Sequence, residues 1–119
     1  MLNLDTHILV HALLGDLTKR EEKLLSKEAW SISDIVLWEI AKLTELKRIE
    51  IDLGDSEVLS VLSRIHVWPI SLDICRAMLA LDFESDPADE IIAATSVAHR
   101  IPLLTRDDKI LRSMMVPFA

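Results

Sequence analysis

Apolar residues along the chain alternate between short continuous runs and helical spacing, which predicts strands alternating with helices. The expected strands are residues 2–5, 29–32, 67–70 and 101–105. The expected helices are residues 6–14, 18–27, 33–48, 55–65, 71–81, a sixth that opens at 86–87, and 107–114. Strands that alternate with helices form a parallel sheet covered on both faces. The expected fold class is therefore α/β, a three-layer α/β/α sandwich with a short parallel sheet.

Several residues suit the ends of these elements. Gly15 can end the first helix, and Ser33 is a good N-cap for the third. Pro69 places the third strand at an edge of the sheet, or ends it, because proline cannot donate a backbone hydrogen bond. Asp86 and Pro87 open the sixth helix, since proline is favoured at the first helical position after a capping acid.

Length and composition suit an ordinary folded domain. The 119 residues fit one domain, residues 1–119. Half of them are hydrophobic, so a sizeable core can form and global disorder is not expected. Only two glycines and no tyrosine argue against an all-β design, which needs many turns and aromatic strands.

The single cysteine and the lack of long apolar runs bear on location. Cys75 cannot form an internal disulfide, which indicates a reducing compartment. It lies in an apolar helical stretch, so we expect a small buried side chain. No secretory signal is visible, and no apolar run approaches the roughly 18 residues of a membrane span. These features predict a soluble, cytoplasmic protein.

The net charge of −7 comes from 13 basic and 20 acidic residues. This is the wrong sign for a domain that binds nucleic acid through a broad basic surface. It is the right sign for a site that gathers acids around a cation, and equally for an ordinary acidic surface. Charge alone leaves both interpretations open.

Four acids occupy positions that a parallel sheet would bring together. Asp5 and Asp107 follow the first and last strands, Asp89 lies in the first turn of the sixth helix, and Glu39 lies in the second turn of the third. In open α/β sheets the functional crevice lies beyond the carboxyl ends of the strands. We therefore expect the four carboxylates to lie at that edge.

Each acid also has a purely structural interpretation. Asp89 and Asp107 lie at helix starts, where acids complement the helix dipole, and Asp5 fits a turn. Glu39 could form an exposed ion pair with Lys42. Its neighbours at helical spacing are apolar, however, which indicates an inward side chain that needs a partner. Those neighbours are Ile35, Leu43 and Leu46.

Metal chemistry gives the four acids a common purpose. Carboxylates that lie close together repel one another, and a divalent cation removes that cost. Mg²⁺ prefers hard oxygen ligands and retains several waters. One such water can be activated to attack a phosphodiester, so that no Ser, His or Cys nucleophile is needed.

Other candidate groups are weaker. His7 and His11 have the i, i+4 spacing of a zinc pair, but no cysteine or third histidine is suitably placed. Two glycines cannot build a phosphate-binding loop. The tryptophans are expected to serve as core and cover rather than as base-stacking platforms: Trp30, Trp38 and Trp68. Three basic residues beside the last strand could contact phosphate or simply be solvated: Arg106, Lys109 and Arg112.

Four short motifs in order resemble the PIN domain, and most closely the VapC toxins of bacterial and archaeal toxin–antitoxin pairs. They are Leu4-Asp5-Thr6-His7, the stretch from Ser33 to Trp38-Glu39-Ile40, Asp86-Pro87-Ala88-Asp89 with the following Ile91-Ile92-Ala93-Ala94-Thr95, and Leu103-Leu104-Thr105-Arg106-Asp107. The resemblance extends from about residue 2 to residue 112. Such a set is more specific than any one of its motifs.

The resemblance implies a PIN-like α/β/α fold, Mg²⁺ or Mn²⁺ dependence and endonucleolytic cleavage of RNA. It also implies a homodimer and inhibition by a small cognate antitoxin of the VapB type. The acidic quartet of the family matches Asp5, Glu39, Asp89 and Asp107. Its small hydroxyl positions match Thr6, Ser33 and Thr105, which would orient the carboxylates. Asp86 is expected to be a helix cap first, with a lesser role towards the metal through water.

One departure from the family and two rival functions remain open. The family usually adds a further strand after the last helix, for which residues 115–118 are barely long enough. A PIN-like module that only binds, without catalysis, is the main rival to the ribonuclease. A metal-dependent phosphatase is less favoured, because His7 stands where an aspartyl-nucleophile phosphatase has its second acid.

Overall fold

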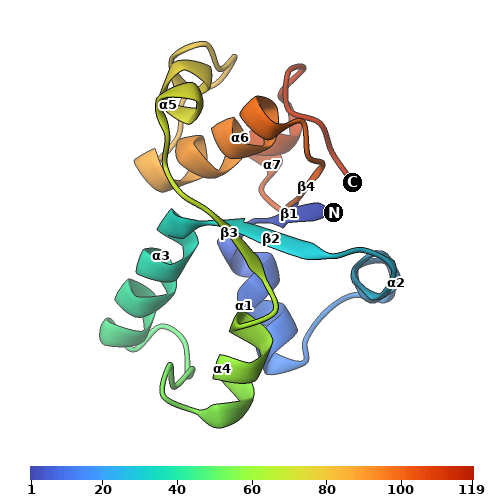
Figure 1. Cartoon of the computed structure of the whole chain (residues 1–119), viewed down its shortest axis with the longest axis vertical. Helices are drawn as coiled ribbons and strands as arrows, with labels where there is room; N and C mark the ends of the chain where they lie inside the picture. Colours follow the sequence, from blue (N-terminus) through green and yellow to red (C-terminus); the bar gives the residue numbers. More distant parts are fainter.

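The computed structural model describes residues 1–119, which form a four-stranded parallel sheet with helices on both faces (Figure 1). The spatial order of the strands is β3-β2-β1-β4, and every pair is parallel. Their bounds are β1 (Leu2–Leu4), β2 (Trp30–Ser33), β3 (His66–Trp68) and β4 (Leu103–Leu104). The predicted α/β class and parallel sheet are confirmed.

The helices make two layers. One face of the sheet carries α1 (Thr6–Leu14), α3 (Asp34–Glu45) and α4 (Ser56–Leu62), drawn below the sheet in Figure 1. The opposite face carries α5 (Leu72–Leu79), α6 (Pro87–His99) and α7 (Asp108–Leu111). Helix α2 (Lys19–Lys27) lies at one end, just before β2. None of these helices combines the length and the apolar character needed to cross a membrane.

The core lies where both helical layers press on the central strands. Leu4 of β1, Ile8 of α1 and Ile92 of α6 are completely buried in one cluster of 17 apolar residues. The polar side chain of Asn3, on β1, is buried as well. Its Nδ2 donates to the Ile92 carbonyl (3.2 Å) and to Ser96 Oγ (2.9 Å). This link holds α6 in a defined position relative to β1.

Helix ends follow the sequence signals in most cases. Gly15 ends α1 with φ of 72°, and Ser33 Oγ accepts from the Ile35 backbone N–H at 3.4 Å as the N-cap of α3. Pro87 is the first residue of α6. Asp86 occupies the N-cap position, but its side chain makes no capping hydrogen bond, so its predicted capping role is wrong.

Most predicted boundaries shift by a few residues, and two of these shifts have a clear local cause. Helix α3 ends at Glu45 rather than Arg48, because Lys47 takes a left-handed backbone conformation with φ of 58°. Strand β3 is an edge strand that ends at Trp68, directly before Pro69, which confirms the effect expected of that proline.

The C-terminal edge of the sheet is reduced to one bridge. Leu103 pairs with Phe118 in parallel, and its N–H donates to the Pro117 carbonyl at 2.8 Å. The Ala119 N–H then donates to the Leu103 carbonyl at 3.1 Å. A single bridge therefore stands where the resemblance predicts a further strand.

Two side chains expected inside the molecule are exposed. Cys75 is exposed, because the inward face of α5 passes through its neighbour Ile74, which is fully buried. A helix rotates by about 100° per residue, which turns Cys75 outward. Trp38 is 59% exposed, so its predicted role in the core or its cover is wrong.

Candidate metal centre

A crevice is expected where β1 and β4 lie side by side, because their chains continue in different directions. After β1 the chain enters α1 on one face and proceeds towards β2. After β4 it enters α7 on the other face and ends beyond β4. Such a reversal of connection is where open α/β sheets form their ligand sites. Asp5 and Asp107 follow these two strands.

Asp5 lies deepest at this position, with 2% of its surface exposed. Its Oδ1 accepts from the Thr6 backbone N–H at 2.7 Å, and its Oδ2 accepts from Thr105 Oγ1 at 2.6 Å. Burial raises the pKa of Asp5, and the hydrogen bonds from Thr105 and Thr6 oppose that rise only in part. The two threonines therefore hold a carboxylate that has no cation bonded to it.

Glu39 reaches the same region from α3. Its Oε1 accepts from Thr6 Oγ1 at 2.5 Å, and burial raises its pKa above the ordinary value. Negative charge on Asp89 and Asp5 adds to the rise. The alternative pairing with Lys42 does not occur, because Lys42 Nζ contacts Glu45 at 3.1 Å instead. Glu39 thus faces inward, as predicted, and its partner is a hydroxyl.

Asp89 belongs to the first turn of α6. Its Oδ2 accepts from Ser85 Oγ at 2.9 Å. Burial raises its pKa, and the negative charges of Asp5, Asp107 and Asp86 add to this. A residue that only complemented a helix dipole would be held ionised by its surroundings. The raised pKa of Asp89 therefore argues against that interpretation as its whole role.

Asp107 has a clear structural duty as well. It is the N-cap of α7, where its Oδ1 accepts from the backbone N–H groups of Lys109 (2.8 Å) and Ile110 (3.2 Å). Asp107 therefore caps α7 with its own side chain. Thr105 Oγ1 instead accepts from the Asp107 N–H at 3.0 Å while it donates to Asp5.

The four acids influence one another electrostatically, which places them in one region. The charge of Asp107 raises the pKa of Asp5. The charges of Asp5 and Asp89 raise the pKa of Glu39, and those of Asp5 and Asp107 raise the pKa of Asp89. Thr6 donates a hydrogen bond to Glu39, and Thr105 donates one to Asp5. Ser33 does not join them, since its hydroxyl caps α3.

Only one basic group offsets this charge, and it is weakly placed. His7 is exposed and lowers the pKa values of Asp5 and Glu39 without bonding to either. Arg106 is already committed elsewhere: its Nε and Nη2 bind the two oxygens of Glu21 at 2.8 and 2.6 Å. Arg106 is therefore neither a free phosphate contact nor an ordinary solvated side chain.

Sequence reasoning passed over His7 as part of the site and did not consider Ser85. The signal for Ser85 was its place just before a helix start, four residues ahead of Asp89. A small hydroxyl there can reach back to the acids of the first turn. In the structure Ser85 bonds to Asp89 through its hydroxyl and to Glu90 through its backbone N–H at 3.2 Å.

The donor set suits a hard cation. Every candidate ligand is a carboxylate oxygen, and Mg²⁺ and Mn²⁺ favour such ligands. No three acidic, histidine or cysteine side chains converge tightly enough to form a complete ligand set. The His7–His11 pair has no third ligand, and His11 lies 3.4 Å from Asp16 instead. Zinc is not favoured.

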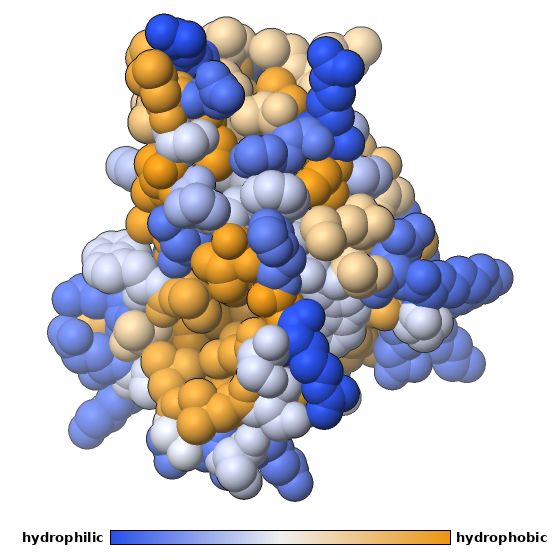
Figure 2. Space-filling view, viewed as in Figure 1, coloured by the Kyte–Doolittle hydropathy of each residue, from blue (hydrophilic) through white to orange (hydrophobic).

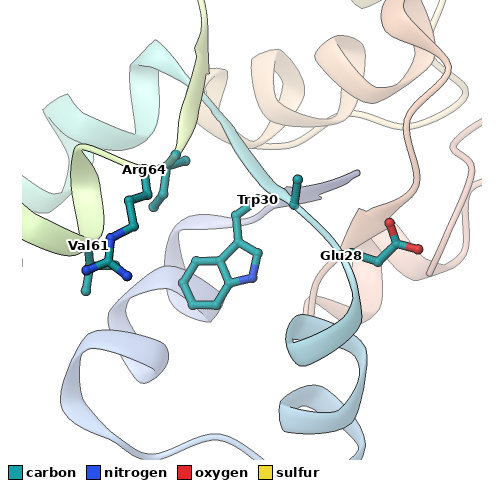
Figure 3. Close-up of a pocket in the computed structure, with 6 residues that line it drawn as sticks. Glu28, Trp30, Val61 and Arg64 are labelled. Atoms are coloured by element: carbon teal, nitrogen blue, oxygen red, sulfur yellow. The ribbon is translucent and has the colours of Figure 1, made fainter.

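A separate cavity of about 290 Å³ lies at the opposite end of the strands from these acids. Trp30 forms one side, with Val61 and Arg64 of the α4 region across from it (Figure 3). Trp30 begins β2 and Ile65 precedes β3, so the cavity is at the amino edge of the sheet, opposite the acids. It contains no part of the candidate metal centre.

A family model for the PIN domain matches residues 3–114, nearly the whole chain. The chain therefore belongs to the PIN domain family. No curated protein matches the sequence significantly.

Solved structures with the same fold include toxin–antitoxin complexes. VapBC2 from Rickettsia felis, bound to a DNA fragment from its promoter, gives a TM-score of 0.75 at 22% identity, covering 100% of this chain and 98% of that chain. A toxin–antitoxin complex from Klebsiella pneumoniae gives 0.72 at 24% identity, with coverage of 96% and 92%. FitAcB from Neisseria gonorrhoeae gives 0.67 at 20% identity, with coverage of 100% and 97%. At these identities the likeness concerns the fold.

Proposed function

We propose that this protein is a cytoplasmic, metal-dependent endoribonuclease, and the toxin of a VapBC-type toxin–antitoxin pair. The observation that carries the proposal is the group of acids beyond the carboxyl ends of β1 and β4, where the chain connection reverses. Three of its members, Asp5, Glu39 and Asp89, have raised pKa values and no cationic partner. A fold gains nothing from gathering carboxylates in this way unless a cation completes the site.

Asp5, Glu39, Asp89 and Asp107 would hold Mg²⁺ or Mn²⁺. The ion would supply an activated water and charge stabilisation at the scissile phosphodiester. Thr6 and Thr105 fix the orientation of Glu39 and Asp5, as groups behind metal ligands commonly do. The raised pKa of Glu39 brings this carboxylate nearer to neutral pH, which suits a group that accepts a proton from the attacking water.

The proposed partners are RNA, a small VapB-type antitoxin and a second copy of the chain. The antitoxin is supported by the complexes that share the fold. An arginine from such a partner would suit the acids, since it stays charged and can bond two carboxylate oxygens. The homodimer is supported by the outer face of α5, where Leu72, Cys75 and Leu79 share one side and the two leucines are 65% and 82% exposed.

A cleavage assay tests the proposal. Purified protein is incubated with a mixed single-stranded RNA in Mg²⁺ or Mn²⁺, with and without a chelator, and beside a small phosphate ester. Metal-dependent internal cleavage of the RNA alone is expected. Hydrolysis of the ester without RNA cleavage would indicate a phosphatase, and no hydrolysis of either would indicate a PIN module that only binds.

A further inference from the structure

A second cavity, of about 480 Å³, adjoins the proposed metal centre between α3 and α6. Its volume lies within the range of roughly 300–1,000 Å³ that is common for small-ligand sites. Glu39 belongs both to this cavity and to the acidic site, so the two are continuous. The apolar lining residues are Ile35, Trp38, Pro87, Ala88 and Ile91.

Trp38 is the largest side chain of this lining, and it is 59% exposed. It precedes Glu39 on α3, so an indole and a proposed metal ligand are adjacent in the chain. Large aromatic side chains are usually buried, and their flat faces bind other flat rings well. An exposed indole in an apolar cavity beside a phosphodiester site is therefore suited to stack on a base.

The charged residues that line the cavity make it unsuitable for a phosphate group of the RNA other than the scissile one. Its only charged lining residues are Glu39 and Asp86, and both are acidic. A phosphate would be repelled, whereas a neutral heterocycle would not. The exposed Asp86 side chain makes no capping hydrogen bond, so it can accept one from an exocyclic amino group. Adenine, cytosine and guanine carry such groups, and uracil does not.

We propose that this cavity binds one unpaired base of single-stranded RNA, next to the scissile phosphate, with the base stacked on Trp38 and its amino group bonded to Asp86. This inference rests on the proposed ribonuclease function and specifies the substrate as RNA with a splayed-out base. Single-stranded RNA is commonly recognised through such unstacked bases on aromatic side chains. The apolar side chains that Figure 2 shows between α3 and α4 form a separate area and do not line this cavity.

The first experiment combines a protein change with a substrate change. The cut position is mapped on a single-stranded oligonucleotide, and abasic sites are then placed on either side of it. With wild type, one abasic site should lower kcat/KM about 5- to 150-fold, the range for loss of one base–aromatic stack. Trp38→Ala should show the same loss on the intact oligonucleotide and little further loss on the abasic one. Trp38→Phe should retain most activity, and Leu59→Ala, a truncation of an exposed apolar side chain on α4, should behave as wild type.

Equal sensitivity of wild type and Trp38→Ala to the abasic site would overturn the proposal. A second contrary outcome would be that Trp38→Ala converts a dimer to a monomer in light scattering while the abasic site has no effect on cleavage. Trp38 would then be a subunit contact rather than a base-binding residue.

The second experiment needs no catalysis. In chelator, single-stranded oligoadenylate should quench the tryptophan fluorescence of wild type, and an abasic oligomer of the same length should not. Trp38→Phe, which keeps Trp30 and Trp68, should lose this quenching. Asp86→Asn should weaken binding of oligoadenylate more than binding of oligouridylate. If wild type fails to cleave RNA but the quenching occurs, the ribonuclease proposal falls and the base site stands; if the quenching is absent, the base site falls.

Discussion

Two buried acidic regions of this protein have opposite electrostatic character. Glu21 is 5% exposed, and its carboxylate accepts hydrogen bonds from Arg106 Nε and Nη2 and from the Thr18 backbone N–H. The hydrogen bonding to Arg106 is the main cause that lowers the pKa of Glu21 to about 2. Asp5 is 2% exposed, and its pKa is raised, because burial outweighs the lowering effect of its hydrogen bonds from Thr105 and Thr6. Both side chains have little exposed surface, but burial is the main influence on the pKa of Asp5, whereas the arginine hydrogen bond is the main influence on the pKa of Glu21.

The difference separates a structural acid from a candidate functional one. At Glu21 the chain supplies its own cation and completes the charge balance. Beyond the ends of β1 and β4 it gathers four carboxylates that form no salt bridge, and in the proposal a metal ion would balance their charge. Perturbed pKa values of this kind are common at functional sites, whereas an internally paired acid usually serves the fold. The predictions below test this contrast.

The largest expected effect is on catalysis. Asp5→Asn should lower kcat/KM on RNA by more than the 10- to 100-fold typical of residues that merely orient metal ligands, since it removes a ligand charge at almost constant volume. Steady-state cleavage in Mn²⁺ measures this. Glu21→Gln is the matched control and should stay within a few-fold of wild type below its melting temperature. Similar losses of kcat/KM in both variants would contradict the assignment of Asp5 to a functional site and of Glu21 to a structural ion pair.

The next effect is stabilisation by metal. At ten to a hundred times Kd, Mg²⁺ or Mn²⁺ should raise the free energy of unfolding of wild type by roughly 1.4–2.7 kcal/mol. Asp107→Asn and Asp89→Asn should gain less. In chelator both variants should be as stable as wild type or slightly more stable, because like-charge repulsion falls. Asparagine is also a good N-cap, so α7 keeps its cap in Asp107→Asn. Thermal melts that show no metal response, with both variants less stable in chelator, would rule out a shared site.

A smaller loss of stability is expected at the paired acid. Arg106→Ala leaves Glu21 buried without its cation and should cost about 1–2 kcal/mol, at the lower end for such a group because the arginine side chain is 37% exposed. Urea unfolding in chelator measures it. Addition of Mg²⁺ should not restore this loss, and restoration by metal would mean that the two regions share charge.

The smallest effect is on pH dependence. The raised pKa values of Asp5, Glu39 and Asp89 mean that the folded protein holds more protons than the unfolded chain above about pH 4.5. Metal-free stability should therefore fall as pH rises through that window towards 7. Glu21 acts the other way, since its contribution is present above pH 4.5 and is lost as pH falls towards 2. Urea melts from pH 3 to 8 in chelator should show maximum stability at mildly acidic pH. A flat profile would contradict the raised values.

The sheet and most of the acidic site followed from simple patterns in the sequence. Short apolar runs and helical spacing were enough to predict the layers, and parallel strands placed Asp5 and Asp107 at one edge. Glu39 and Asp89, early in the third and sixth helices, were expected at the same edge, and the resemblance to the PIN domain then matched all four acids to the family's quartet. These features depend on periodicity and topology, which neighbouring residues largely determine.

Features that depend on side-chain direction were harder to predict. Cys75 and Trp38 lie in apolar stretches but point outward, because one step along a helix reverses exposure. The Arg106–Glu21 pair joins residues 85 positions apart, and no local signal announces such a contact. Ser85 shares this limit, since its bond to Asp89 requires the turn before α6 to fold as it does.

The hydrogen bond from Thr105 to Asp5 spans 100 positions in the sequence, and β1 pairs directly with β4. During synthesis the first of the four acids leaves the ribosome long before the last. Parallel pairing between such distant strands is slow to form compared with local helices. The nascent chain therefore carries no assembled acidic centre until its C-terminal segment has emerged and docked, which separates the making of the polypeptide from the onset of the proposed activity.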